Sequence, residues 1–254
     1  MKVLVTGAKG LIGQNVMHLL KDKGIPFIGD ITNEKAYQSL SKVDAVIHLA
    51  AITDTTLKDD NEMIRVNFGG FKNILHYCRK KNIRLVYASS AAVYGCGGKP
   101  LSAYASSKFL CEDISRGYSN AVGLRYFNVY GYSEEHKGNS ASMIYQLYKQ
   151  MKAGKRPRIF KYGEQKRDFI YVKDAAEATV NALTKGEGVI DVGTGVATSF
   201  NDVVDILNDV MKTDLMPEYI DNPYPFYQDY TCSNNKVGKY SLEEGVWDYE
   251  SYLH

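Results

Sequence analysis

Val3-Leu-Val-Thr-Gly7-Ala-Lys-Gly10-Leu-Ile-Gly13, near the start of the chain, decides its fold. The apolar run at 3–6 predicts a buried strand, and the apolar spacing over 11–23 predicts a helix. The three glycines between them let the backbone come close to a ligand, and the start of the helix offers unpaired N–H groups. The alternative interpretation is a tight turn without a ligand, which would need the same glycines. Because this turn joins a strand to a helix, it predicts a dinucleotide-binding site.

The first half of the chain alternates short apolar runs with helical patterns, as parallel sheets with crossover helices do. Continuous apolar strands such as Ala45–Ala50 suit a sheet that is covered on both faces. The predicted fold is therefore α/β, a Rossmann-type doubly wound parallel sheet with a small C-terminal substrate-binding lobe. Strands are expected at 3–6, 25–29, 44–50, 84–89 and 122–126, and helices at 11–23, about 34–41, 61–81 and 103–117.

After Gly131 the pattern changes. A polar loop precedes a predicted helix near 140–153, and Ser199-Phe-Asn-Asp202 resembles a capping box that starts a helix of about 13 residues. Strands are expected at 169–172 and 189–192 around a helix beginning at Asp174, while 220–254 predicts no definite element. We expect 1–131 with about 168–195 to form the dinucleotide-binding domain, and about 132–167 with 196–254 to form the lobe.

Length and composition exclude several classes of protein. The chain has 254 residues, of which 44% are apolar and 24% charged, as in an ordinary globular protein. A net charge of +2 gives no reason to expect nucleic acid or a membrane surface as partner. No run of 18 apolar residues occurs and the N-terminus enters the first motif at once, so we expect a cytoplasmic protein without a signal peptide. The cysteines Cys78, Cys96, Cys111 and Cys232 lie far apart and predict reduced, mostly structural residues and no metal site.

Asp30 is the candidate for the acidic residue that follows such a glycine turn by about 20 positions. A carboxylate there would accept hydrogen bonds from both adenosine-ribose hydroxyls and repel a 2′-phosphate. Since no Arg occurs from 14 to 64, the sequence favours NAD, and NADP stays open. A position at the adenine edge and a simple turn aspartate are the alternative interpretations of Asp30.

Tyr104 and Lys108, four residues apart in a predicted helix, would share one helix face. The spacing itself is weak, because Tyr77/Lys81, Tyr145/Lys149, Tyr148/Lys152 and Tyr162/Lys166 repeat it. Only Tyr104/Lys108 closely follows an apolar strand that ends in hydroxyls, at Ser89-Ser90.

An ammonium beside a phenol stabilises the phenolate, so Tyr104 could take a proton from a sugar hydroxyl while hydride leaves the same carbon. Ser90 would hydrogen-bond the reacting oxygen, and Ser89 would support the cofactor or substrate. An exposed Tyr/Lys pair on an amphipathic helix is the alternative.

Several motifs cover the chain nearly end to end: Gly7-Ala-Lys-Gly-Leu-Ile-Gly13, His48-Leu-Ala-Ala51, Val66-Asn67, Tyr87-Ala-Ser-Ser-Ala-Ala-Val-Tyr-Gly95, Tyr104/Lys108, Arg125-Tyr-Phe-Asn-Val-Tyr-Gly131 and Arg167-Asp-Phe-Ile-Tyr-Val-Lys-Asp174. Together they resemble the extended short-chain dehydrogenase/reductases, which act mostly on nucleotide sugars. The resemblance implies NAD(P) bound by Gly7, Gly10, Leu11, Ile12, Gly13, Asp30, Ile31, Leu49, Ala50, Ala51, Asn67, Ser89, Tyr104, Lys108 and Tyr126.

The same resemblance implies that Ser90, Asn128 and Arg167 contact the substrate, with Asn128 on its diphosphate or sugar. The planar fork of Arg167 suits a phosphate, although a surface Arg is the other interpretation. His48 is expected to be neutral and near the cofactor.

Within this family the chain is most similar to the ADP-glycero-manno-heptose 6-epimerases. The similar segments are His136-Lys-Gly-Asn-Ser-Ala-Ser142, Val192-Gly-Thr-Gly195 followed by Ser199-Phe200, and Tyr227-Gln-Asp-Tyr-Thr231. In those enzymes the lysine of the His-Lys-Gly segment is the second acid/base, so the resemblance implies that role for Lys137. A solvated loop lysine is the alternative.

The expected activity is NAD(P)-dependent epimerisation of a nucleotide-activated sugar, by transient oxidation to a keto intermediate and reduction on the opposite face. A dehydratase is disfavoured, because Ala91-Ala92 follow Ser90 where dehydratases typically carry Asp-Glu. A net reductase or dehydrogenase is the nearest rival, and a non-catalytic cofactor-binding sensor is a further one.

Two departures from the family leave the sugar open. Only eight residues separate Gly95 from Tyr104, and the stretch between the second and third strands is almost deleted. The resemblance also implies a homodimer or higher homo-oligomer that forms through the helices near 61–81 and 103–117.

Overall fold

The structure is a computed structural model that describes residues 1–38, 42–54, 59–95, 100–223 and 227–253. The chain forms two compact units. Unit 1 comprises Met1–Tyr126 and Ala176–Asp191, and unit 2 comprises Phe127–Ala175 and Val192–His254. The chain therefore passes between the units three times.

Unit 1 is built on a six-stranded sheet of order β2-β1-β3-β4-β5-β9. The four neighbouring pairs from β2 to β5 are parallel, and β1 lies between β2 and β3, so the chain winds outward from β1 in both directions. The predicted fold class is confirmed. The strands are β1 (Val3–Thr6), β2 (Gly24–Pro26), β3 (Ala45–His48), β4 (Arg84–Ser90), β5 (Ala121–Tyr126) and β9 (Gly188–Val192).

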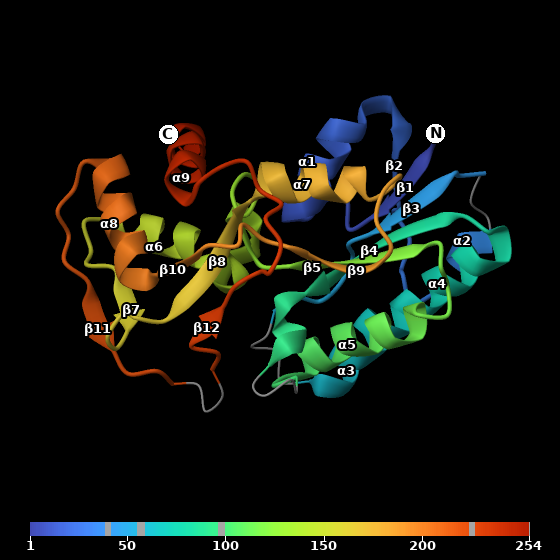
Figure 1. Ribbon diagram of the computed structural model, residues 1–254, viewed down its shortest axis with the longest axis horizontal. Coiled ribbons are helices and arrows are strands. Elements are labelled where there is room, and N and C mark those ends of the chain that lie inside the picture. The colour runs from blue at the N-terminus through green and yellow to red at the C-terminus, as the bar shows by residue number, and fades with distance from the viewer. Residues whose placement is uncertain (39–41, 55–58, 96–99, 224–226, 254) are drawn as a thin grey trace. The chain divides into compact units, whose positions relative to one another are not determined.

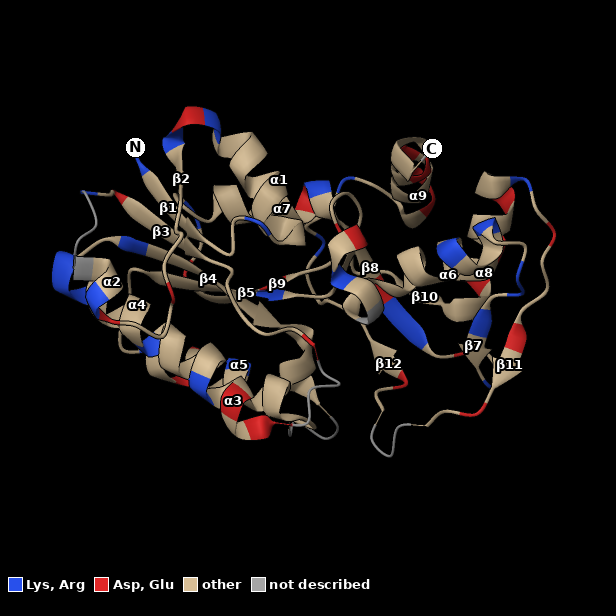
Figure 2. Cartoon of the chain, turned by 180° about the vertical axis from the view of Figure 1, so that it is seen from behind, with Lys and Arg blue, Asp and Glu red and all other residues tan. Residues whose placement is uncertain are grey.

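Helices cover both faces of this sheet, α1 and α7 on one and α4 and α5 on the other (Figure 1). A core of Leu4, Val46 and Leu85 from the strands packs against Phe71 and Ile74 of α4. Charged residues lie mainly on the helices and loops around the sheet (Figure 2). The helices are α1 (Leu11–Leu20), α2 (Lys35–Gln38), α3 (Asp60–Ile64), α4 (Gly70–Lys81), α5 (Ala103–Ser115) and α7 (Val172–Asn181).

The helix predicted over 61–81 is divided by a π-helical turn, η2 (Arg65–Gly69), between α3 and α4. At the start of α4 a Cβ on Gly70 would lie 2.7 Å from Ile31 Cδ1, so the helix packs directly on the segment after β2. That segment is short: only α2 is formed between β2 and β3 in the part of the chain that the structure describes. The predicted helix over 34–41 ends outside the described residues.

Unit 2 is organised around β8 (Lys166–Tyr171), which pairs with three short strands. A separate parallel pair joins two other strands. The strands around β8 are β6 (Asn128–Tyr130), β10 (Ala197–Ser199) and β12 (Tyr230–Thr231), and the separate pair is β7 (Arg158–Phe160) with β11 (Glu218–Ile220).

The helices of unit 2 are α6 (Met143–Lys152), α8 (Phe200–Met211) and α9 (Leu242–Leu253). The predicted capping box is present, because the Ser199 side chain accepts from the Asp202 N–H and the Ser199 N–H donates to the Asp202 carboxylate. The sequence predicted no element for α9. Its Asp248 Oδ2 accepts hydrogen bonds from Tyr132 at 2.6 Å, Tyr171 at 2.5 Å and Lys173 at 2.7 Å, which hold the helix in place.

Among the described residues, no helix has both the length and the apolar character needed to cross a bilayer. Cys78 and Cys111 are buried free thiols, and Cys96 lies outside the described residues.

Candidate active site

The glycine turn after β1 leaves no room for side chains. Gly7 has a φ of +69°, and a Cβ on it would lie 2.6 Å from the Ala50 nitrogen. A Cβ on Gly13 would overlap the carbonyl oxygen of Gly7. The turn is closed by a hydrogen bond of 3.0 Å from Gly10 N to Gly7 O. Strand, turn and helix are thus packed backbone against backbone, as a dinucleotide site requires.

Helix α1 begins at this turn with its amide groups available to an anion. Gly10, the residue before the helix, has no side chain to cap it, and the first turn has no acidic residue. The positive end of the helix dipole and its first N–H groups therefore fit a diphosphate. The predicted Leu11 and Ile12 are the first two residues of this helix, and Leu11 is buried.

His48 closes the neighbouring strand as a neutral residue. It is buried, and its Nδ1 shares a hydrogen bond of 2.8 Å with Thr6 Oγ1, which also accepts from Ala50 N at 3.2 Å. Burial, helped by the positive charge of Lys108, lowers the pKa of His48 to about 3. These contacts fix Leu49, Ala50 and Ala51 beside the glycine turn, since Leu49 N also donates to Thr6 O.

Asp30 lies in an exposed turn four residues after β2 ends. Its Oδ1 accepts hydrogen bonds from Thr32 N at 2.8 Å and Thr32 Oγ1 at 2.9 Å, and these lower the pKa of the carboxyl. Asn73 on α4 donates to the carbonyls of Ile31 and Thr32, so the turn is anchored to that helix. The geometry is that of a turn aspartate, and the ribose contact stays a prediction.

Asn67 ties the segment after β3 to helix α5. Its side chain accepts from Ile52 N at 2.7 Å and donates to Ile52 O at 3.0 Å and to Ser107 Oγ at 3.2 Å. Tyr126, also predicted near the cofactor, shares a hydrogen bond of 2.7 Å with Thr179 Oγ1 and is buried. Both polar groups are thus engaged within the protein, and their cofactor contacts stay predictions.

Tyr104 and Lys108 lie one turn apart on α5, with the Lys108 ammonium 5.8 Å from the centre of the Tyr104 ring. The same contact occurs in two other Tyr-x-x-x-Lys pairs, at 5.5 Å for Tyr145/Lys149 and 5.4 Å for Tyr148/Lys152.

What sets Lys108 apart is burial. It is only 5% exposed and donates a hydrogen bond of 2.9 Å to Ala88 O in β4, whereas Lys149 and Lys152 are exposed. A buried, fixed ammonium can stabilise a phenolate far more than a solvated one.

Ser90 ends β4 and caps the short 3₁₀ turn η3 (Ala91–Tyr94), to which α5 packs closely. Its Oγ accepts from Ala92 N at 3.2 Å, which leaves the hydroxyl hydrogen to be donated elsewhere. Ser89 behaves differently: it is buried and donates to Glu112 Oε1 at 2.5 Å. The support predicted from Ser89 therefore does not use a free hydroxyl.

The substrate residues predicted in the second half lie in unit 2. Arg167 on β8 is 8% exposed, its guanidinium is 4.8 Å from the centre of the Tyr227 ring, and Nη1 donates to Lys166 O. Burial lowers the pKa of Arg167, opposed by the nearby Tyr227 and Asp229. On the adjacent strand β6, Asn128 Nδ2 donates to Asp168 O at 3.1 Å.

Lys137 lies half-buried in the 3₁₀ segment η4 (Glu135–Ser140). Burial lowers its pKa, and the negative charge of Glu134 opposes this shift. Glu134 is fully buried and accepts hydrogen bonds from Gly131 N at 3.1 Å and from Ser142 N at 2.6 Å. The lysine is therefore carried by a segment whose two ends are joined through one carboxylate.

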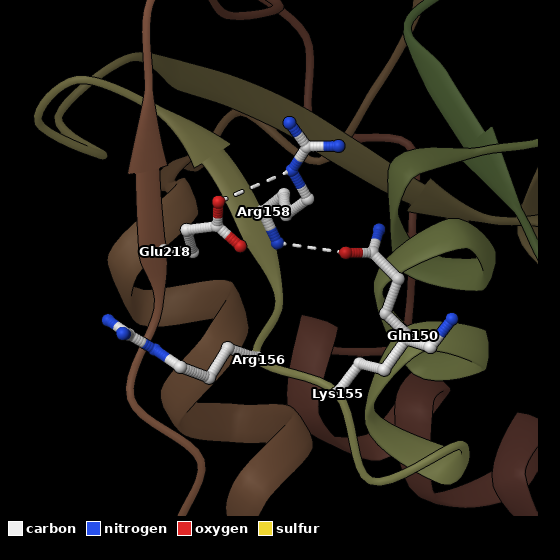
Figure 3. Close-up of a pocket in the computed structure, with 5 residues that line it drawn as sticks. All are labelled: Gln150, Lys155, Arg156, Arg158 and Glu218. Carbon is white, nitrogen blue, oxygen red and sulfur yellow. Dashed lines mark hydrogen bonds and ion pairs between the residues drawn. The ribbon is translucent and has the colours of Figure 1, made fainter.

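A basic pocket of about 560 Å³ in unit 2 is separate from these residues (Figure 3). Arg158 N donates to Gln150 Oε1, and Arg158 Nε lies 3.7 Å from Glu218. Arg156 donates to the backbone carbonyls of Met216 and Pro217, so its guanidinium is already occupied. The pocket is lined by Gln150, Lys155, Arg156, Arg158 and Glu218, none of which the sequence predicted as a site residue.

Sequence reasoning missed several buried carboxylates that hold the segments next to the candidate residues within each unit. Glu112 is four residues after Lys108 in the same helix, and that spacing could have placed it on the same face. Glu134 and Asp168 are buried carboxylates whose partners are mostly backbone N–H groups. No spacing rule in the sequence predicts such partners.

Unit 1 combines a doubly wound sheet and a glycine turn with a Ser, a Tyr and a buried Lys on β4 and α5. This combination defines an enzyme of the extended short-chain dehydrogenase/reductase type. The chain belongs to the NAD dependent epimerase/dehydratase family, whose sequence profile matches residues 3–193. The resemblance predicted from the sequence is confirmed.

Solved structures agree. ADP-L-glycero-D-manno-heptose-6-epimerase of Helicobacter pylori is 30% identical with a TM-score of 0.89, over 100% of this chain and 96% of that one. UDP-N-acetylglucosamine 4-epimerase of Methanobrevibacter ruminantium, in complex with UDP-N-acetylmuramic acid, is 25% identical with a TM-score of 0.89, over 99% and 97%. UDP-glucose 4-epimerase of Thermotoga maritima, 24% identical with a TM-score of 0.91 over 100% and 98%, shares the fold.

Proposed function

We propose that this protein is an NAD-dependent epimerase of a nucleotide-activated sugar. The family and the epimerases among the similar structures support the class of reaction. The observation that carries the proposal is the buried Lys108, which is fixed by Ala88 O and lies against Tyr104. An ammonium held in this way has a clear use in stabilising a phenolate, and a structural pair on a helix surface has no need of it.

The residues of unit 1 fit NAD. The side-chain-free turn at Gly7, Gly10 and Gly13 and the uncapped start of α1 would hold the diphosphate, with Leu49–Ala51 beside them. NAD held there would supply the redox chemistry, as acceptor and later donor of a hydride from a carbinol carbon of the substrate. Asp30 would receive the adenosine ribose, and this contact rests on the sequence prediction.

Side chains of the protein itself would transfer the protons. Tyr104, as phenolate, takes the proton of the sugar hydroxyl, and Lys108 stabilises that charge. Ser90 donates its hydroxyl hydrogen to the same sugar oxygen, since the bond that it accepts from Ala92 N leaves that hydrogen available. A keto sugar results, and reversal of these transfers on one face restores the starting sugar.

Lys137 is proposed to serve the opposite face. Burial lowers the pKa of Lys137, so this lysine gives up its proton more readily than a solvated lysine does, as an acid/base group must. Arg167 would bind the diphosphate of the substrate, because its buried guanidinium has a planar fork and an aromatic support. Asn128, on the neighbouring strand, would contact the diphosphate or sugar.

The test is proton NMR of the purified protein with ADP-, UDP- and GDP-sugars and no added cofactor. A new epimer without net oxidation or reduction supports the proposal and identifies the substrate. Conversion only after NADH or NADPH is supplied would make the protein a reductase and remove the role of Lys137. Mass spectrometry of the nucleotide released on denaturation distinguishes NAD from NADP.

We further propose that the chain forms a homo-oligomer through α3, α4 and α5. Phe109 on α5 is 40% exposed, an apolar surface of the kind that a helical interface would cover. Light scattering over a range of concentrations tests this proposal. A monomer at every concentration rules it out.

A further inference from the structure

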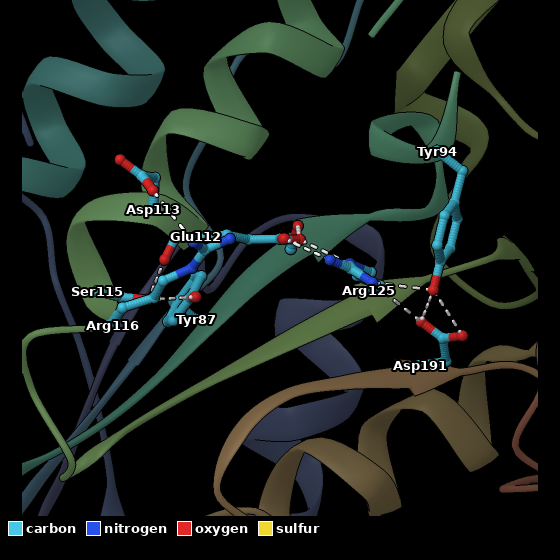
Figure 4. A network of polar contacts seen from close by, with 9 residues as sticks. Tyr87, Tyr94, Glu112, Asp113, Ser115, Arg116, Arg125 and Asp191 are labelled. Atoms are coloured by element: carbon cyan, nitrogen blue, oxygen red, sulfur yellow. Dashed lines mark hydrogen bonds and ion pairs between the residues drawn. The ribbon is translucent and has the colours of Figure 1, made fainter. Parts of the chain in front are cut away.

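A polar network at the end of β4 takes no part in the proposed chemistry (Figure 4). Glu112 accepts hydrogen bonds from Ser89 Oγ at 2.5 Å and from Nε and Nη2 of Arg125 at 2.8 and 2.6 Å. Arg125 Nη1 donates to the Tyr94 hydroxyl at 2.9 Å. That hydroxyl lies 2.7 and 2.9 Å from the two carboxylate oxygens of Asp191, to which it donates. The network thus joins α5, β4, β5, η3 and β9.

Ser90 lies between two anchors of this network. One residue before it, Ser89 is fixed to Glu112. Four residues after it, Tyr94 ends the 3₁₀ turn that Ser90 caps through Ala92 N. The orientation of the Ser90 hydroxyl depends on this turn, because the turn supplies the N–H that bonds to one of its two lone pairs.

The Tyr94 hydroxyl reaches β9 through its hydrogen bonds to Asp191. The ring is 38% exposed and also stacks on Arg125, whose guanidinium carbon is 4.8 Å from its centre. Removing the hydroxyl would therefore keep the ring against Arg125 and release the turn from Asp191. Asp191, which is 7% exposed, would keep Arg125 Nη1 at 3.9 Å.

We propose that Tyr94 is a positioning residue for Ser90: its hydroxyl, held between Arg125 and Asp191, fixes the turn that aims the Ser90 hydroxyl at the reacting sugar oxygen. The inference rests on the proposed function for the role of Ser90. Tyr94 would act on the reacting oxygen only through Ser90.

The kinetic test is a double-mutant cycle on the full chain. Tyr94→Phe should lower kcat by about ten- to a hundredfold, the effect expected of a small misplacement, and leave KM within about twofold. In a Ser90→Ala background, Tyr94→Phe should lower kcat by less than about twofold, because no Ser90 hydroxyl remains to be positioned. If the two losses multiply, Tyr94 does not act through Ser90 and the inference is overturned.

Tyr118→Phe is the matched control. Tyr118 is another tyrosine of unit 1 whose hydroxyl is hydrogen-bonded within that unit, to Cys78 O at 3.1 Å and Ile83 O at 2.7 Å. It should leave kcat within about twofold of the wild-type value, because its bonds lie away from the turn. A loss equal to that of Tyr94→Phe would show a general effect on stability and overturn the inference.

A second readout does not depend on activity. Hydrogen exchange of a peptide covering 90–95 should be at least about fivefold faster in Tyr94→Phe than in Tyr118→Phe, since the turn opens more often. Equal exchange overturns the positioning role. If the wild-type protein converts no sugar, the proposed function fails, and the exchange result still decides whether Tyr94 holds the turn.

Discussion

The Lys108 ammonium reaches past the Tyr104 ring to the carbonyl oxygen of Ala88, so one helix residue is bound to the strand that ends at Ser90. This contact fixes the distance between the helix that carries the proposed base and the strand that carries the proposed hydrogen-bond donor. It also keeps the ammonium out of water, where its charge acts most strongly on the phenol.

Tyr104→Phe should therefore lose at least about a hundredfold in turnover, the usual contribution of a general acid–base group, while cofactor content stays unchanged. Turnover is measured by NMR on the sugar found in the substrate panel, and cofactor content by absorbance of the denatured extract.

Tyr148→Phe is the control, because Tyr148 also has a lysine four residues later, whose ammonium is 5.4 Å from its ring centre. Turnover should be within about twofold of wild type in this variant, since Lys152 is exposed and lies in α6. An active Tyr104→Phe variant would remove Tyr104 as the base.

Lys137→Met should lower the epimerisation rate about 10²- to 10⁴-fold, because the acid/base group for one face of the sugar is lost. Substrate affinity should change little. Lys149→Met, which removes an exposed lysine of α6, should have no effect. Turnover is followed by NMR and affinity by calorimetry. Full turnover in Lys137→Met would leave the residue as a loop lysine.

Arg167→Met should weaken binding of the substrate and of the free nucleoside diphosphate about 10- to 100-fold, the value of one or two charged hydrogen bonds. Thermal stability should be unchanged or higher, because a buried guanidinium without a carboxylate in hydrogen-bond contact among the described residues costs folding free energy. Calorimetry and thermal melts measure the two effects. The control is Arg158→Met, which removes an exposed arginine of β7. A large loss of stability without weaker binding would show that Arg167 is structural.

His48 should make the protein sensitive to acid. Its pKa in the folded protein is about 3 against an ordinary value of 6.5, so the unfolded chain binds the extra proton between these values. The free energy of unfolding should then fall as the pH falls from about 6.5 towards 3, by up to about 1.4 kcal/mol per pH unit from this residue.

Urea unfolding at several pH values measures this dependence. In His48→Asn, the free energy of unfolding should fall less steeply with falling pH below pH 6.5, even if this variant is less stable at pH 7. His18→Asn, which removes an exposed histidine of α1, should keep the wild-type slope. An unchanged slope in His48→Asn would mean that carboxylates alone cause the acid sensitivity.

Much of unit 1 could be predicted because its signals are local. Continuous apolar runs marked β3, β4 and β5 to within two residues at each end, and the glycine turn marked α1. β2 is shorter than predicted: the run 25–29 includes Ile28, which is 90% exposed. The π-helical turn at Arg65–Gly69 was missed, because apolar periodicity does not distinguish it from an α-helix.

Unit 2 could be predicted less well. β6, β7, β10, β11 and β12 have two or three residues each, too few for a period to show. Helix α9 was missed because the residues that it buries, Gly245, Val246 and Tyr249, hardly form an apolar stripe. The candidate site residues were predicted by motif, and their roles stay predictions. The buried carboxylates Glu112 and Glu134 were not predicted, because no motif or spacing rule points to their partners.

The two hydrogen bonds that the Glu134 carboxylate accepts, from Gly131 N and Ser142 N, have a consequence for how the sequence of this protein can evolve. These two hydrogen bonds join the end of β6 to the start of α6 without using residues 135–141, so we expect an added or deleted residue there to change mainly the enclosed segment. The loop that carries Lys137 can thus be remodelled toward a differently shaped sugar while the framework around it keeps its fold.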